Sequence, residues 1–244
     1  MFGRKKEPAA VPPPLPLPSA AAGTAGQAPP VRETLFGDMP LESRGGSDAT
    51  DVPWTHFADA ARHLKAGDAR GAADALMAVL RLPGLESRHY LQAYHHFRAL
   101  GVDPPEELAK ELLGVVIEVP MERGLDLLAA YADGSSRYYN YSGAAVLMDA
   151  PDEAIRDATD ALLSASREVV PRIGPWQGSR PPPPDGGQVR LNFLTPSGLH
   201  FGQGAYEDLM RDPLAGPVLQ AATSLMTRLV QRAEPNHTRT SSGL

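Results

Sequence analysis

The side chains best suited to bind a ligand or a partner lie in the second half of the chain, in three separate segments. A tyrosine-rich segment at residues 131–149 carries four of the chain's seven tyrosines and one arginine. Trp176 follows in a Pro/Gly-rich segment, and His200 and Gln203 follow in a glycine-rich one. Arginine holds anions, tyrosine and tryptophan anchor interfaces, and histidine transfers protons near neutral pH. The candidate binding residues are therefore Arg137, Tyr139, Tyr141, Trp176, His200 and Gln203.

The tyrosine-rich segment is predicted to form a β-hairpin. Asp133-Gly134 is the signal of a two-residue type I′ turn, in which both central residues adopt positive φ. On the returning strand, alternation places Arg137, Tyr139 and Tyr141 on one face. The residues between them face the other way: Tyr138, Asn140 and Ser142. One of the two adjacent tyrosines is expected to pack under a helix, and the opposite face is expected to meet a partner or a ligand.

The other two segments each have a structural and a functional interpretation. Trp176 lies in the long loop I-G-P-W-Q-G-S-R-P-P-P-P-D-G-G (residues 173–187), where it either packs back on the domain or serves as a lid or partner anchor. The pattern G-L-H-F-G-Q-G (residues 198–204) is typical of a strand, and its glycines indicate a bulge or a close backbone approach rather than a phosphate loop. If the segments converge, a pocket forms under the Trp176 loop from five residues: Arg137, Tyr139, Asn140, His200 and Gln203.

Several kinds of chemistry find no support in the residue pattern. The chain has no cysteine, which removes thiol nucleophiles and thiolate metal sites. Two histidine pairs stand seven residues apart, whereas helical metal ligands usually stand four apart, so we expect no metal site. No nucleophile elbow supports Ser-His-Asp catalysis, and we predict neither a catalytic residue nor a cofactor. A formal charge of −6, with dispersed Lys and Arg, argues against nucleic-acid binding.

Composition divides the chain into four parts. Residues 1–52 are rich in Pro, Ala and Gly and hold few bulky apolar side chains, so we expect a disordered leash. Within it, residues 31–41 either hide a docking motif or cap the folded part. Residues 53–111 are predicted to be a helical module, residues 112–233 an α+β domain, and residues 234–244 a polar tail. Because no signal-peptide core and no 18-residue apolar run is found, we expect a cytoplasmic protein without a membrane span.

Periodicity predicts the elements of the two folded parts. The helical module contains a hairpin over residues 54–83, a third helix over 86–100 and a short fourth helix begun by Asp103-Pro104. The α+β domain follows the order βββ-α-ββ-α, with strands at residues 113–119, 125–131, 137–148, 189–195 and 199–206. The fold class is therefore α+β: N-terminal helical hairpins packed on a five-strand antiparallel sheet with two covering helices.

The first helical hairpin, residues 54–83, resembles a tetratricopeptide unit. The matching small and large residues are Ala60, Gly67, Asp68, Ala72, Leu76 and Pro83. At fold level the α+β domain resembles roadblock and other profilin-type modules, although roadblock domains place two strands before the middle helix and three after it. This resemblance implies a platform for dimerisation and regulation. Segments 87–102 and 112–119 are similar to predicted bacterial proteins to which no function is assigned.

Two functions are consistent with these observations. The first is a non-enzymatic adaptor for protein interaction or regulation, which uses its helical-hairpin and sheet surfaces to bind another protein or a second copy of itself. The alternative is a small-molecule sensor or an enzyme, whose pocket lies near Arg137, Tyr139 and His200 under the Trp176 loop. The alternative requires Arg137 and His200 to share one face of the sheet.

Overall fold

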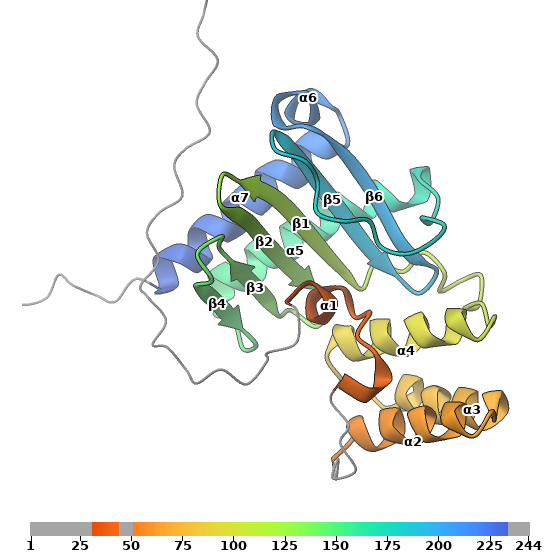
Figure 1. Ribbon diagram of the computed structural model, residues 1–244. Helices are drawn as coiled ribbons and strands as arrows, with labels where there is room; N and C mark the ends of the chain where they lie inside the picture. The colour runs from red at the N-terminus through yellow and green to blue at the C-terminus, as the bar shows by residue number, and fades with distance from the viewer. Residues whose placement is uncertain (1–30, 44–50, 234–244) are drawn as a thin grey trace, which may run out of the picture.

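The structure is a computed structural model, and residues 31–43 and 51–233 are described (Figure 1). The expected leash at residues 1–30 and 44–50 and the expected polar tail at 234–244 lie outside the described residues. The elements are α1 (Val31–Phe36), η1 (Leu41–Ser43), α2 (Trp54–Lys65), α3 (Ala69–Arg81), α4 (Ser87–Ala99), β1 (Gly114–Met121), β2 (Gly124–Tyr131), β3 (Ser136–Tyr139), β4 (Ala145–Met148), α5 (Glu153–Arg167), η2 (Val170–Arg172), β5 (Gln188–Thr195), β6 (Gly198–Ala205), α6 (Tyr206–Arg211) and α7 (Ala215–Ala233).

The strands form one antiparallel sheet of six strands, in the order β4-β3-β2-β1-β5-β6. The α+β class and the antiparallel sheet are confirmed, but the expected number of five strands is wrong. The segment 137–148 divides into β3 and β4 because Asn140 closes a turn between them. Its Oδ1 accepts hydrogen bonds from the backbone N–H groups of Ser142 at 3.0 Å and Ala144 at 3.1 Å. The single strand predicted over residues 137–148 is therefore a hairpin of two strands.

Helices α5 and α7 cover one face of the sheet, which we call the helix face (Figure 1). Their positions follow from local signals: Asp152 accepts a hydrogen bond from the Ile155 N–H at 3.0 Å, and Asp212 accepts one from the Ala215 N–H at 2.8 Å. Such caps satisfy backbone donors that the first turn of a helix leaves unpaired. The core on this side includes fully buried Leu162, Val218, Leu225 and Leu229. These are the two covering helices that the sequence predicts.

Helices α1 and α4 pack on the opposite face, which we call the N-terminal face. Leu35 and Phe36 of α1 join Leu91 of α4 and Val116 and Tyr131 of the sheet in one buried cluster. The Tyr131 hydroxyl donates to the Leu35 carbonyl at 2.7 Å. Residues 31–41 therefore cap the folded part, and the expectation of a disordered leash up to residue 52 is wrong for Val31–Ser43. Their apolar side chains find a partner surface that lies far away in the sequence.

The close approach of α1 to α4 depends on Gly37. Its φ of 66° lies in the left-handed region, and a Cβ placed on it would lie 2.7 Å from the Leu91 Cβ. A side chain at this position would both strain the backbone and collide with α4. The absence of a side chain at Gly37 therefore allows α1 to pack closely against α4.

Helices α2 and α3 form an antiparallel hairpin that packs on α4 through Phe57, Leu76, Val79 and Phe97. The predicted fourth helix after Asp103 is wrong. Residues 105–111 form successive turns instead, with the Leu108 N–H bonded to the Pro105 carbonyl at 3.0 Å. The segment has little apolar surface to bury, and Leu108 itself is exposed.

The turn between β2 and β3 confirms the predicted hairpin and corrects its type. Only Gly134 has positive φ, at 85°, and the Tyr131 N–H closes a longer loop by donating to the Ser135 carbonyl at 3.0 Å. Asp133 accepts hydrogen bonds from the Ser135 N–H at 2.8 Å and from the Ser87 N–H of α4 at 2.6 Å. The Asp133 side chain thus joins α4 to the β2–β3 turn of the sheet.

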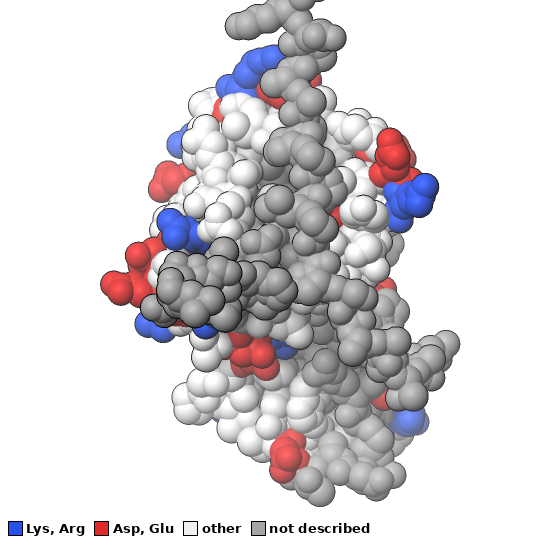
Figure 2. Space-filling model, turned by 90° about the vertical axis from the view of Figure 1, so that its left-hand side faces the viewer, with Lys and Arg blue, Asp and Glu red and all other residues white. Residues whose placement is uncertain are grey.

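Two observations concern the outer surface. No helix within residues 31–43 and 51–233 is long and apolar enough to cross a membrane. Figure 2 shows the side of the molecule that lies on the left in Figure 1. Outside the grey atoms, acidic and basic side chains are scattered among uncharged ones on this side.

Candidate functional site

The structure separates Arg137 from His200. Arg137 pairs with Ala129 across the sheet and lies on the N-terminal face, whereas His200 pairs with Phe193 and lies on the helix face. Tyr139 and Gln203 do share the N-terminal face, but they stand on β3 and β6, with three strands between them. The five-residue pocket expected under the Trp176 loop therefore does not form.

The tyrosine-rich segment is mostly built into the fold. Arg137 is buried and forms ion pairs with Asp149 at 2.7 Å and Glu86 at 3.2 Å. Tyr138 is the buried member of the tyrosine pair, on the helix face, and its hydroxyl donates to the Asp126 carboxylate at 2.8 Å. Tyr139 is half-buried on the other face, and Tyr141 is exposed in the β3–β4 turn. These residues do not make one continuous binding surface.

Gln203 lies at the exposed edge of a polar network on the N-terminal face, whose centre is buried. It accepts a hydrogen bond from Arg190 Nε at 2.7 Å, and Arg190 also donates to the Pro182 carbonyl at 2.7 Å. At the centre lies Glu118, fully buried, with Arg190 at 3.4 Å and Arg32 of α1 at 2.7 Å. This network fastens the proline-rich loop and α1 to the sheet, so we assign Gln203 a structural role.

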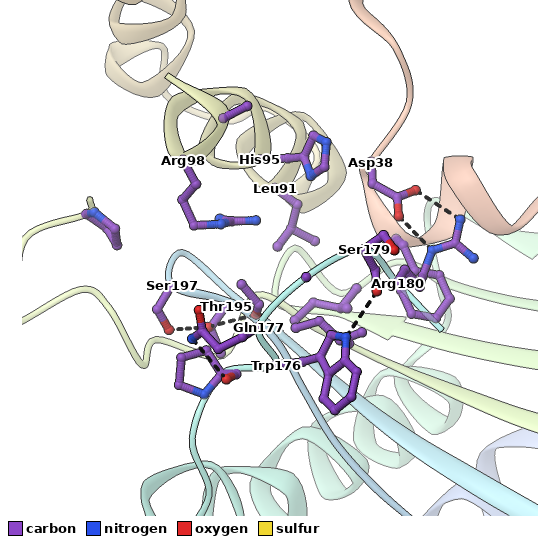
Figure 3. A pocket seen from close by; sticks show the side chains of 18 of the residues that line it. Asp38, Leu91, His95, Arg98, Trp176, Gln177, Ser179, Arg180, Thr195 and Ser197 are labelled. Carbon is purple, nitrogen blue, oxygen red and sulfur yellow. Dashed lines mark hydrogen bonds and ion pairs between the residues drawn. The ribbon is translucent and has the colours of Figure 1, made fainter. Parts of the chain in front are cut away.

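A cleft of about 650 Å³ lies where the helical module meets the α+β domain (Figure 3). Its walls are α4, residues 36–38, residues 103–109, the loop that carries Trp176, and the end of β5 with the β5–β6 turn. A cavity of this size falls within the range that holds small-molecule ligands. The residues that line it are Phe36, Asp38, Leu91, His95, Arg98, Ala99, Asp103, Pro104, Ala109, Pro175, Trp176, Gln177, Gly178, Ser179, Arg180, Leu194, Thr195, Ser197, Gly198 and Leu199.

Two elements place the main side chains of the cleft. Leu91, His95 and Arg98 follow one another at helical spacing, so a single face of α4 presents all three (Figure 3). Across the cleft, the backbone N–H of Trp176 donates to the Leu199 carbonyl of β6 at 2.6 Å. The Trp176 indole N–H donates to the Ser179 carbonyl at 3.0 Å, and its ring packs on Phe201 with the centroids 5.2 Å apart. The tryptophan is thereby held at the cleft wall with 47% of its surface exposed.

Arg98 and Arg180 both bring positive charge to the cleft, but only Arg180 is paired with carboxylates. Arg180 is ion-paired with Asp38 at 2.6 Å and with Glu33 at 3.3 Å. Arg98 donates to the Pro196 carbonyl at 2.5 Å, and no described carboxylate lies within ion-pair distance of it. Burial lowers the pKa of Arg98, an effect that the charge of Asp103 partly opposes. Arg98 is therefore a desolvated cation without a counter-ion among the described side chains.

His95 stands beside Arg98 and is uncharged. Burial lowers its pKa to about 4, and the nearby charges of His96, Arg98 and Arg180 act in the same direction. A neutral imidazole offers one donor and one acceptor to a ligand.

His200 lies beneath the cleft rather than in its wall. It is fully buried, and its Nε2 is 3.1 Å from the Ser197 Oγ, which does line the cleft. Its Nδ1 is 3.2 Å from the Ile173 carbonyl oxygen. Among the predicted site residues, only Trp176 lines the cleft directly, and His200 reaches it through Ser197.

The sequence analysis missed Arg98, His95 and Ser197. The signal for the first two was a pair of polar residues at helical spacing from Leu91, on a helix whose other face is apolar. Ser197 lies between the two strands predicted at residues 189–195 and 199–206, where its residue type carries no information about a neighbouring histidine. Comparison of the chain with models of protein families, with curated proteins and with solved structures finds no match.

Proposed function

We propose that the protein binds a small ligand carrying an anionic group, of the carboxylate type, in the cleft between α4 and the Trp176 loop. The observation that supports this most is the state of Arg98. A desolvated charge is costly unless it is paired, and the cleft contains the space in which a counter-ion would pair with Arg98. A guanidinium is also the side chain best shaped to hold a carboxylate with two parallel hydrogen bonds.

The remaining walls suit the rest of such a ligand. Trp176 and Leu199 offer apolar surface across the cleft from Arg98, and Leu91 adds apolar surface on the same face of α4. Neutral His95 adds a hydrogen-bonding group that does not compete with Arg98 for the anion. The cleft therefore combines apolar surface with polar groups that can orient a ligand, as ligand sites do.

Trp176 provides the means to test this proposal, because it lines the cleft and the only other tryptophan, Trp54, can be replaced. In a Trp54→Phe background, Trp176 fluorescence is titrated with aromatic and aliphatic carboxylates and with their uncharged amides. We expect saturable changes with carboxylates and none with amides. Arg98→Gln should weaken binding by about tenfold or more, whereas Arg81→Gln, an exposed arginine at the end of α3, should not. Equal binding of acids and amides, or equal binding by the Arg98 variant, would contradict the proposal.

The adaptor function is the second candidate, and one observation favours it. The α2–α3 hairpin projects away from the sheet beyond α4 (Figure 1), and Leu64 and Met77 on it are 38% and 36% exposed. A hairpin so placed is free to contact another protein or a second copy of the chain. The tetratricopeptide-like and roadblock-like resemblances and the cytoplasmic location remain predictions.

The two candidates are separable by experiment. Leu64→Glu with Met77→Glu should abolish recovery of a partner, or self-association measured by light scattering, while leaving carboxylate binding unchanged. If partner recovery or self-association persists in the double variant, the α2–α3 surface is not the docking site.

A further inference from the structure

We propose that Ser197 and His200 form a nucleophile–base pair in the cleft and transfer the acyl group of an ester to water. The inference deepens the proposed function, since it uses the same cleft, but it does not depend on the preference for an anion. The Ser197 Oγ lies 3.1 Å from His200 Nε2. This distance is within the range over which a base activates a hydroxyl nucleophile.

The hydrogen bonds of His200 set the direction of the Ser197–His200 contact. The Ile173 carbonyl oxygen can only accept, so the Nδ1 that faces it at 3.2 Å carries the ring proton. Nε2 is then the unprotonated nitrogen and accepts the hydroxyl proton of Ser197. Thr195 is consistent with this assignment, because its hydroxyl donates to the Gly198 carbonyl at 3.1 Å and lies 2.9 Å from the Ser197 Oγ. The backbone carbonyl of Ile173 thus orients the base, the role that a carboxylate has in many triads.

A ligand in the cleft can reach the serine of this pair, while the histidine is shielded from solvent. Ser197 lines the cleft, whereas His200 is fully buried behind it. Burial lowers the pKa of His200, and the charge of Lys110 adds to the lowering, whereas the hydrogen bond that its Nδ1 donates to the Ile173 carbonyl opposes it. The imidazole is therefore in its base form at neutral pH, shielded from solvent and in contact with a nucleophile that ligands can reach.

Arg98 supplies the third component of an acyl-transfer site. Its Nη1 donates to the carbonyl of Pro196, the residue before Ser197, at 2.5 Å. A Cβ placed on Gly198, the residue after Ser197, would lie 3.5 Å from Arg98 Nε. The guanidinium therefore borders the serine on both sides of the turn, where its other N–H groups can stabilise a developing oxyanion.

The reaction balances without a further reagent. Ser197 Oγ attacks the ester carbonyl carbon while its proton passes to His200 Nε2, and the oxyanion forms beside Arg98. Collapse breaks the bond to the alkoxy group, which leaves as an alcohol with the proton from Nε2. Water then attacks the acyl-serine and gives a proton to Nε2, and the acid leaves as that proton returns to Ser197 Oγ. Ester and water give acid and alcohol.

A purely structural hydrogen bond between the turn and a buried histidine makes a different prediction. In that case Ser197 has no special reactivity, and reagents selective for activated serines leave it unmodified. The full-length protein is therefore incubated with a fluorophosphonate, and modified peptides are identified by mass spectrometry. We expect modification at Ser197, loss of modification in Ser197→Ala, and a rate about 100-fold lower in His200→Gln. Ser142→Ala is the matched control, because Ser142 also stands in a hairpin turn with its hydroxyl bonded to Asn140 at 2.7 Å, and it should react like the parent protein.

Folding and ligand preference are controlled separately. Because His200 is buried, each variant is compared by thermal unfolding, and the modification rate of the parent protein is also followed against pH, where it should fall as His200 becomes protonated. An unmodified Ser197 in the folded parent protein, or a parent-like rate in folded His200→Gln, would overturn the proposal. Carboxylate binding to Trp176 with an inert Ser197 would refute only the nucleophile–base pair, and modification of Ser197 without carboxylate binding would refute only the anion site. Turnover of p-nitrophenyl acetate, an uncharged ester, should be lost in Ser197→Ala.

Discussion

Arg32 and Glu118 form an ion pair at 2.7 Å although 86 positions separate them in the chain. Glu118 lies on the central strand and is fully buried, and its other carboxylate oxygen is 3.2 Å from Asn192 Nδ2 and 3.4 Å from Arg190. Arg32 also donates to the Pro181 carbonyl at 3.1 Å. One carboxylate therefore holds together α1, the sheet and the loop that carries Trp176.

Replacing Glu118 should consequently destabilise the whole assembly. In Glu118→Ala the buried guanidinium of Arg190 and the partly buried one of Arg32 lose their counter-ion, and loss of one partner of a buried pair typically costs about 3–5 kcal/mol. Glu122→Ala, at an exposed position in the turn that follows the same strand, should change the free energy of unfolding by less than about 0.5 kcal/mol. Urea denaturation of both variants measures the difference. Similar values for the two would show that the network does not stabilise the fold.

The packing of α1 on α4 can be tested with two glycines of similar backbone conformation. Gly37 has φ of 66° and Gly67 has φ of 74°, but no atom lies within 4 Å of a Cβ placed on Gly67. Gly67→Ala should therefore cost only the backbone term, about 1–2 kcal/mol. Gly37→Ala adds the collision with Leu91 and should cost more, as measured by thermal or urea unfolding. Equal losses in the two variants would mean that α1 does not approach α4 as described.

The adjacent tyrosines provide a second matched pair. Tyr138→Phe removes the hydrogen bond to the Asp126 carboxylate and should cost about 1.5–3 kcal/mol, the usual contribution of a bond to a charged group. Tyr139→Phe removes a hydroxyl that makes no hydrogen bond with any side chain or backbone group of the described residues, so its cost should be near zero. The free energies of unfolding distinguish the two. A larger loss for Tyr139→Phe would reverse the assignment of the two faces.

The elements that the sequence predicted well are those with strong local signals. The β-branched residues of β1 favour a strand, and the capping residues and apolar stripes of α5 and α7 favour helices, so the local sequence is enough to predict these three elements. Helix α1 was missed because its six residues gain stability from Tyr131 and Val116, which are distant in the chain. The β3–β4 turn was missed because the Asn140 side chain closes it. The alternation of side chains between the two faces continues before and after this turn, so residues 137–148 resemble one strand.

The cleft could not be predicted for a related reason. Its walls come from five stretches of the chain, and only Trp176 was conspicuous by residue type. Periodicity places Arg98 on one face of a helix, but it does not show whether that face meets solvent or another part of the fold. Arg137 illustrates the converse, since an arginine in a tyrosine-rich strand suggested a surface anchor, but it is buried and ion-paired with Asp149 and Glu86.

The neutral state of His95 leads to a prediction about pH. Its pKa in the folded protein is about 4, below the ordinary value of 6.5, because burial disfavours the charged ring. As the pH falls below about 6.5, the unfolded chain takes up a proton at this position before the folded protein does. The contribution of His95 to stability is therefore fully present above the ordinary pKa, and it is lost progressively as the pH falls toward 4.

His95→Asn should reduce this dependence on pH. In the parent protein, the free energy of unfolding should fall by about 1–2 kcal/mol from this residue alone between about pH 7 and pH 5. Burial likewise lowers the pKa of His96 and of His200, so part of the loss should remain in the variant. Urea denaturation at the two pH values, with His56→Asn on α2 as the control, measures the change in slope. An unchanged slope in His95→Asn would show that the ring at the cleft is not held in its neutral form, and it would remove the support that a neutral His95 gives to anion binding at Arg98.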